Sequence, residues 1–209
     1  RTVDGDLGLD AANPRYYTDM KGSKENKGNV HGHIIRLGEA KPTDRAFKWD
    51  IFLFGSEEDA AANINLSGLT ASNAFSSPDG LWFSKATGIC WIQTDDGAYT
   101  DETNCMLLAA IPGTVGDGSK ITVDNKMTVS GAEVTGKQET FIGAALGDAK
   151  LRRFLVAPKG AEVTGITESA DGKALFVNIQ HPGENTPAIG SAAAHAYESQ
   201  WPGNAGYGP

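Results

Sequence analysis

The sequence predicts an all-β fold made of short antiparallel strands, and three observations support this prediction. The 209 residues include 26 glycines, and turn dipeptides recur along the chain, as in proteins with many short strands. No long stretch repeats apolar residues at the spacing of an amphipathic helix. An arrangement in which a carboxylate precedes a strand, a turn and a second strand occurs twice, at residues 77–95 and 160–181.

The first part of the chain predicts a loop followed by two strands. The first 28 residues are polar and glycine-rich, so we expect an extended surface loop there. Residues 33–37 and 49–54 are β-rich runs joined by a polar connection that contains proline, as in a hairpin or meander. Residues 57–66 combine three alanines with asparagines, which favours one or two helical turns.

The remainder of the chain predicts a repeated four-stranded unit. Further strands are expected within 77–83 and 88–95, at 104–110 and 151–156, and then in the second carboxylate unit. Four antiparallel strands followed by a restart are typical of a β-propeller blade. We therefore expect one propeller domain over residues 1–209, with an insertion within a blade at 113–149 and an irregular tail at 182–209.

Composition and charge limit the possible partners. The chain has 18 Lys and Arg against 26 Asp and Glu, and hence a formal net charge of −8, which argues against a nucleic-acid or anionic-membrane surface. No apolar run approaches the roughly 20 residues that a membrane span requires. The sequence begins at Arg1 without an initiator Met or an apolar leader, so we expect a processed or truncated piece.

The chain has two cysteines, Cys90 and Cys105, which flank a predicted hairpin centred near Gly97. Two cysteines exclude a disulfide-rich scaffold and a four-cysteine zinc site. A cross-strand disulfide is geometrically possible in an oxidising compartment. The alternative is a pair of small buried thiols, and the sequence leaves both open.

The acids of the two repeated units, Asp79 and Glu162, are the candidate metal ligands. Each stands at the entrance to the first strand of its unit, and equivalent loops of successive propeller blades converge on one axis. Carboxylates brought together repel each other unless a cation neutralises them, so their position predicts a metal site. The alternative is that Asp79 makes an Asx turn and Glu162 is an exposed rim residue.

The hexapeptide Gly-Ala-Glu-Val-Thr-Gly occurs twice, at 131–136 and at 160–165. We expect Glu133, in the first copy, to be a solvated surface acid. Among the histidines, His31 and His33 are either two ligands on one face of a strand or hydrogen-bonded structural residues. His181 either caps a strand end or reaches the channel. The sequence has no phosphate-binding glycine loop, no Gly-x-Ser-x-Gly elbow and no His-Glu-x-x-His motif.

Several runs of the sequence resemble the C-terminal portion of PhoX-type alkaline phosphatases. These runs are residues 13–15, 32–36, 77–83, 91–95, 153–156, 162–165 and 176–184. The Asn-Ile-Gln-His-Pro-Gly-Glu run at 178–184 is highly specific. The resemblance covers most of the chain apart from the 113–149 insertion and the extreme tail.

The resemblance implies a six-bladed propeller that hydrolyses phosphate monoesters with calcium and iron, in bacterial enzymes exported to the periplasm or secreted. It assigns Asp79 and Glu162 as metal ligands, although the family often has Cys where this sequence has Ala161. Members of the family are much longer, so an Arg-Pro-Glu-like segment and further metal acids are expected before Arg1.

The chain is thus expected to supply about two blades of six and to be inactive without the missing part. Because each end strand would leave an unpaired edge, we expect a partner, either the missing propeller segment or another copy of the chain. Two other functions stay open, a calcium-dependent propeller lactonase and a non-catalytic propeller fragment.

Overall fold

The computed structural model describes residues 8–129, 131–192 and 197–203. Within these ranges it has twelve strands and one four-residue helix, α1 (Gly147–Lys150), so the predicted all-β class is confirmed. No helix among the described residues is long and apolar enough to cross a membrane.

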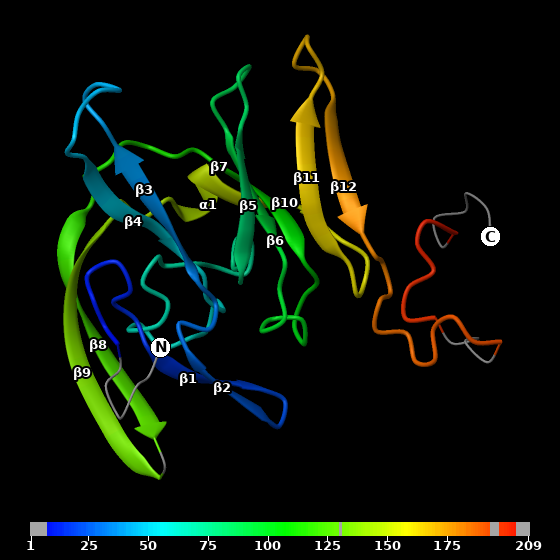
Figure 1. Ribbon diagram of the computed structural model, residues 1–209, viewed down its shortest axis with the longest axis horizontal. Helices are drawn as coiled ribbons and strands as arrows, with labels where there is room; N and C mark the ends of the chain where they lie inside the picture. The colour runs from blue at the N-terminus through cyan, green and yellow to red at the C-terminus, as the bar shows by residue number, and fades with distance from the viewer. Residues whose placement is uncertain (1–7, 130, 193–196, 204–209) are drawn as a thin grey trace.

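The strands form four sheets, and in Figure 1 three of them run from left to right with the β1–β2 pair below them. One sheet has the order β10-β7-β6-β5 and is antiparallel throughout: β5 (Pro78–Phe83), β6 (Cys90–Thr94), β7 (Met106–Ala110) and β10 (Leu151–Val156). A second has the order β3-β4-β9-β8: β3 (His33–Gly38), β4 (Lys48–Phe54), β8 (Ser119–Val129) and β9 (Ala132–Ile142). Two antiparallel pairs complete the set: β1 (Tyr17–Lys21) with β2 (Lys24–Gly28), and β11 (Glu162–Glu168) with β12 (Leu175–Gln180).

The β10-β7-β6-β5 sheet is the centre of the molecule because both of its faces are covered. Side chains of a strand alternate between the two faces, and β6 is buried at every position. Cys90 and Ile92 pack with Phe52 and Phe75 in one apolar cluster. Trp91 packs in a second cluster, against Ala161 and other residues of the β11 side. Each large apolar side chain buried in this way contributes about 1.5–3 kcal/mol.

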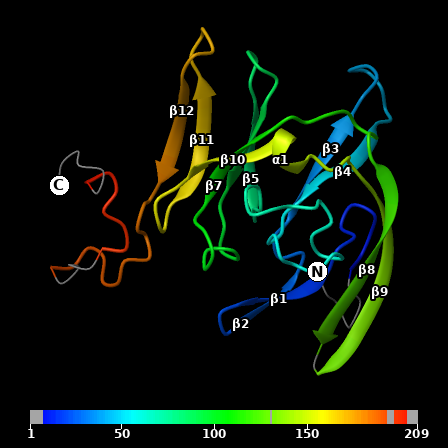
Figure 2. The ribbon, with the colours of Figure 1, turned by 180° about the vertical axis from the view of Figure 1, so that it is seen from behind.

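The central sheet contains the four strands that the first repeated unit predicts, in the predicted order. The second unit differs, because only β11 and β12 pair there, and the described residues do not close into a ring (Figures 1 and 2). Of the two predicted four-stranded units, only the first forms a four-stranded antiparallel sheet, and its identity as a propeller blade stays a prediction.

Residues 113–149 contain the long β8–β9 hairpin, which curves along one side of the molecule (Figure 1). Strand β9 joins β4 in parallel where Ile142 lies beside Ile51. The hairpin also covers the N-terminal segment, since Met127 packs against Tyr16 in a small apolar cluster. This segment thus extends the β3-β4 sheet.

Within residues 8–28 the predicted surface loop is wrong, because residues 14–17 are buried and the β1–β2 hairpin follows. Residues 1–7 of the predicted loop lie outside the described residues. Arg15 is 2% exposed and Tyr17 is 3% exposed. The guanidinium of Arg15 donates hydrogen bonds to the carbonyl oxygens of Gly32 and Gly55, each at 2.9 Å. Buried polar groups are tolerated when they are hydrogen-bonded in this way. The one or two helical turns expected at residues 57–66 are met in part: no helix forms there, but the amide of Asn65 donates to the carbonyl of Ala61 at 2.9 Å, which closes a single α-turn.

The two cysteines are free thiols, both buried. Cys90 lies opposite Ala110 at one end of the β6–β7 pair, whereas Cys105 lies at the other end, where the Asp96 amide donates to its sulfur at 3.1 Å. The two side chains belong to different apolar clusters, so they do not face each other and the disulfide alternative is wrong. Burial raises the pKa of Cys90 to about 11.

Candidate functional site

A pocket of about 390 Å³ lies where β11 begins and β12 ends. The loop between β6 and β7, the loop before β11 and the end of β1 all contribute to its wall. Besides the thiol of Cys105, its ionisable lining residues are Lys21, Asp95, Asp96, Lys159, Glu162, His181, Glu184 and Glu198. Five carboxylates against two lysines give the pocket a net negative charge, which favours cations.

Glu162 and His181 form the best-defined contact in this pocket. Glu162 is the first residue of β11 and lies opposite Gln180, the last residue of β12, so the residue after β12 stands beside it. The Nε2 atom of His181 lies 2.9 Å from Oε1 of Glu162. Glu162 is 8% exposed, so it is not the exposed rim residue of the alternative interpretation.

The imidazole of His181 has acceptors on both sides. Its Nδ1 lies 3.3 Å from the carbonyl oxygen of Gly160 and 3.2 Å from a carboxylate oxygen of Glu184. Partial burial lowers the pKa of His181, but the contacts with Gly160, Glu162 and Glu184 outweigh it, so the pKa lies above its usual value. Both ring nitrogens are therefore placed to donate, as in an imidazolium.

Asp79 lies in β5 as an exposed residue and does not line this pocket. Ser77, two residues before Asp79, does contact the pocket wall, because Ser77 Oγ donates to Oδ1 of Asp96 at 2.9 Å. The structure thus brings Glu162 together with His181 and does not bring Asp79 into the same pocket. That both acids bind a metal stays a prediction. Glu133 is exposed on β9 and pairs with Lys126, which confirms the expected surface role.

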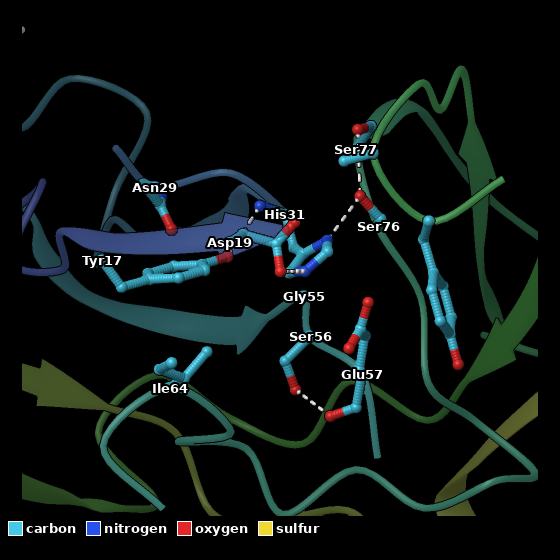
Figure 3. Close-up of polar contacts among 12 residues, drawn as sticks. Tyr17, Asp19, Asn29, His31, Gly55, Ser56, Glu57, Ile64, Ser76 and Ser77 are labelled. Carbon is cyan, nitrogen blue, oxygen red and sulfur yellow. Dashed lines mark hydrogen bonds and ion pairs between the residues drawn. The ribbon is translucent and has the colours of Figure 1, made fainter. Parts of the chain in front are cut away.

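A second group of ionisable side chains comprises Asp19, His31 and Glu57, whose ligand atoms all lie within 4.8 Å of one another. Asp19 comes from β1, His31 from the turn between β2 and β3, and Glu57 from the segment after β4. The Nε2 atom of His31 lies 3.7 Å from Oδ1 of Asp19. Figure 3 shows the Glu57 carboxylate pointing toward the side chains of Asp19 and His31. We call these three residues the triad.

Backbone contacts at Gly55 position two members of the triad. A Cβ at Gly55 would lie 2.4 Å from the carbonyl oxygen of His31, so only glycine allows the two segments to approach so closely. The Gly55 amide donates to the carbonyl of Gly32 at 3.0 Å. Glu57, two residues further on, is therefore held near His31.

The pKa values of two triad residues, Glu57 and His31, depart from their usual values. Burial raises the pKa of Glu57, and repulsion from Asp19 and other nearby acids raises it further, to about 7. Burial also lowers the pKa of His31 despite the neighbouring Asp19. The imidazole is therefore neutral at neutral pH, as a metal ligand must be.

A chain of hydroxyl groups connects the triad with the pocket. His31 Nδ1 lies 3.0 Å from Ser76 Oγ, which lies 3.1 Å from Ser77 Oγ. Ser77 in turn donates to Asp96 in the pocket wall. Strand β1 contributes to both places, because Asp19 belongs to the triad and Lys21 lines the pocket.

Sequence reasoning missed the triad and misplaced its histidine. His31 and His33 do not lie on one face of a strand, since His31 is in a turn and the Nδ1 of His33 contacts the side chain of Asn29 at 2.6 Å. No sequence motif marked Asp19 or Glu57 as a metal ligand, because the segments that contain them were predicted to be a surface loop and a helical turn. The His-x-His spacing was the one available sign.

Comparisons with known proteins give one family and one solved structure. The family model described as alkaline phosphatase PhoX matches residues 9–183. The solved structure of Pseudomonas fluorescens PhoX in complex with vanadate, described as a transition state analogue, is 31% identical with a TM-score of 0.53. The match covers 82% of this chain and 25% of that chain, so this chain spans about a quarter of the length of that relative. A search of curated proteins found no significant match.

Proposed function

The chain belongs to the PhoX alkaline phosphatase family, and we propose that it forms part of a metal-dependent phosphomonoester hydrolase. The observation that supports this most is the buried Glu162 in a pocket rich in carboxylates. The vanadate bound to the related PhoX supports a phosphate ester as the substrate class. The whole activity belongs to a longer protein in this proposal, because the chain matches a quarter of its relative.

Glu162 would be a ligand for calcium or iron in this pocket, whereas Asp79, which does not line it, would bind a metal ion outside it. The oxygen donors of this pocket fit hard cations, which prefer carboxylates and carbonyls. An ion held there would supply Lewis-acid chemistry toward the phosphoryl oxygens. His181 fixes the orientation of the Glu162 carboxylate through the 2.9 Å contact, as residues that support metal ligands do. The lysines of the pocket, Lys21 and Lys159, would attract the phosphate group.

The partner of the chain is proposed to be the remaining propeller segment or another copy. Large apolar side chains are exposed on edge strands of the sheets, among them Phe83 of β5, Phe154 of β10 and Phe176 of β12. Unpaired edges with apolar side chains favour association. Size-exclusion chromatography with mass spectrometry tests this, and a well-folded lone monomer contradicts it. We expect no nucleic-acid or membrane partner, and an exported, periplasmic or secreted, location.

The experiment replaces Glu162 by Gln in the full-length protein. Hydrolysis of p-nitrophenyl phosphate and the calcium and iron content should fall together, because the variant keeps the shape of the side chain and loses its charge. Glu133→Gln is a matched control, since it changes the same position of the same hexapeptide on the exposed β9. Normal metal content and turnover in E162Q would remove Glu162 from the site. Turnover of a lactone without turnover of the phosphate ester would favour the lactonase instead.

A further inference from the structure

We propose that Asp19, His31 and Glu57 form a separate binding site for a divalent transition-metal ion of the zinc type. This proposal does not depend on the proposed function, because none of the three residues lines the pocket of Glu162. A tetrahedral ion with bonds of about 2.1 Å separates its ligand atoms by roughly 3.4 Å. The observed separations, 3.7 Å between His31 and Asp19 and at most 4.8 Å within the triad, need only small side-chain movements to reach that value.

The imidazole of His31 is already oriented as a ligand. A metal-binding histidine usually uses one ring nitrogen for the metal and the other for a hydrogen bond to the protein. Ser76 Oγ occupies Nδ1 at 3.0 Å, which leaves Nε2 on the side of Asp19. The ring of Tyr17 stacks on the imidazole with a centroid distance of 6.0 Å, and the hydroxyl of Tyr17 accepts from the His31 amide at 2.9 Å. His31 is 1% exposed, so little reordering accompanies binding.

A carboxylate oxygen of the triad has no partner. Within the described part of the chain, Oδ2 of Asp19 is a buried atom without a hydrogen bond. Buried polar atoms in native structures almost always have a partner, so this atom points to a group that the polypeptide does not supply. The carboxylates of Asp19 and Glu57 also place oxygens within 4.8 Å of each other, and carboxylates this close repel each other unless a cation neutralises them. A cation placed between the triad residues would satisfy the oxygen and relieve the repulsion.

The mixture of ligands identifies the class of ion. Calcium and magnesium take oxygen ligands, whereas an imidazole nitrogen with carboxylate oxygens suits zinc and similar transition metals. The triad is therefore expected to discriminate against calcium, unlike the all-oxygen donors proposed for the pocket. Since the three ligands come from separate segments of the chain, the ion would also hold these segments together and stabilise the fold.

The test is a titration of metal-free protein with Zn²⁺ and with Co²⁺, in excess calcium. The wild-type protein should bind one ion at this site, with a shift of the His31 side-chain nitrogen resonances and a visible Co²⁺ absorption band. His31→Gln, Asp19→Asn and Glu57→Gln should each weaken this binding by more than about 100-fold, since even supporting residues of metal sites contribute 10- to 100-fold. His33→Gln is the matched control and should bind as the wild type does, because His33 contacts Asn29 instead.

Thermal unfolding separates this proposal from the proposed function. Zn²⁺ should raise the Tm of the wild type and of Glu162→Gln, and it should not raise the Tm of Glu57→Gln. Glu57→Gln and Asp19→Asn keep the side-chain shape, so they test the site even where His31→Gln fails to fold. Unchanged Zn²⁺ binding in Glu57→Gln and Asp19→Asn would overturn the proposal, as would a wild-type protein that binds no Zn²⁺ and gives no His31 shift.

Discussion

Replacement of Arg15 by Met should be among the most damaging substitutions on the N-terminal segment. Arg15 donates four hydrogen bonds: to Oδ1 of Asn29 at 2.8 Å, to the carbonyl of Ile64 at 2.6 Å, and to the carbonyls of Gly32 and Gly55 at 2.9 Å each. Its guanidinium also lies 5.0 and 4.8 Å from the centroids of the Tyr17 and Phe54 rings. Arg15 therefore joins the turn before β3, the end of β4 and the following loop.

The expected loss of stability follows from two opposing effects. Hydrogen bonds to a charged group contribute about 1.5–3 kcal/mol each, with less than full additivity. Burial lowers the pKa of Arg15 to about 10 from its usual 12.5, which corresponds to a cost of about 3 kcal/mol for keeping the charge buried. Met retains most of the apolar stem but removes the donor to the Gly55 carbonyl and to Asn29 Oδ1, whereas the carbonyls of Gly32 and Ile64 keep the amides of Gly55 and Leu66. We therefore expect a net loss of about 3–5 kcal/mol, because each buried acceptor left without a donor costs about 1–3 kcal/mol and the charge-assisted hydrogen bonds are lost as well.

The assay is urea unfolding followed by tryptophan fluorescence. Arg45→Met is the control, because Arg45 is exposed in the connection between β3 and β4 and should lose less than about 0.5 kcal/mol. Arg15→Lys should fall between the two, since an ammonium keeps the charge but cannot reach all four acceptors. A loss below about 1 kcal/mol in Arg15→Met would refute this reasoning, because it would mean that the four hydrogen bonds add nothing beyond solvation.

Three further predictions concern close packing, the cysteines and pH. Gly55→Ala should cost about 3 kcal/mol or more of stability, because the added Cβ meets the carbonyl oxygen of His31 at 2.4 Å. The control Gly97→Ala should cost little, because the space around Gly97 is open. Equal urea midpoints for the two variants would contradict this. The thiols of Cys90 and Cys105, which are both buried, should react slowly with a thiol reagent in the folded protein. Both should react fully after unfolding without reductant. Fewer than two reactive thiols in the unfolded chain would show a disulfide. The pKa of His181 beside Glu162 is raised, so its protonation stabilises the fold below the usual imidazole pKa of about 6.5, and this stabilisation is lost as the pH rises through the folded-state pKa. The difference in unfolding free energy between wild type and His181→Gln should therefore shrink with rising pH. A difference that stays constant with pH would contradict this.

Much of the β structure could be predicted because its signal is local. The strands that became β3, β4, β5, β6, β7, β10, β11 and β12 lie in runs of apolar and β-branched residues bounded by turn residues. The continuous burial of β6 follows from its apolar sequence, which suits a strand covered on both faces. The β1–β2 hairpin could not be predicted in this way, because it is polar. The burial of residues 14–17, which lead into it, depends on the contacts of Arg15 and on partners far along the chain, such as Asn125, whose Oδ1 accepts from the Tyr16 amide at 2.5 Å.

The candidate site could be predicted in part, and for a comparable reason. Glu162 was singled out by its place before a strand pair and by its family context, and the structure places it in a pocket with His181. Asp79 was singled out by the same pattern but is exposed on β5. The difference arises from the position of each acid relative to its neighbouring loops, which the repeat does not encode. The triad depends on tertiary contacts at Gly55, for which no sequence motif exists.

The claim that the pocket of Glu162 is a cation site is tested most directly by a crystal structure of the full-length protein grown with calcium and iron, with anomalous data collected at the iron edge. We predict a cation within bonding distance of a Glu162 carboxylate oxygen, with His181 still in contact with the same carboxylate. A well-ordered pocket in which Glu162 contacts His181 alone, with ions bound elsewhere in the same crystal, would contradict it.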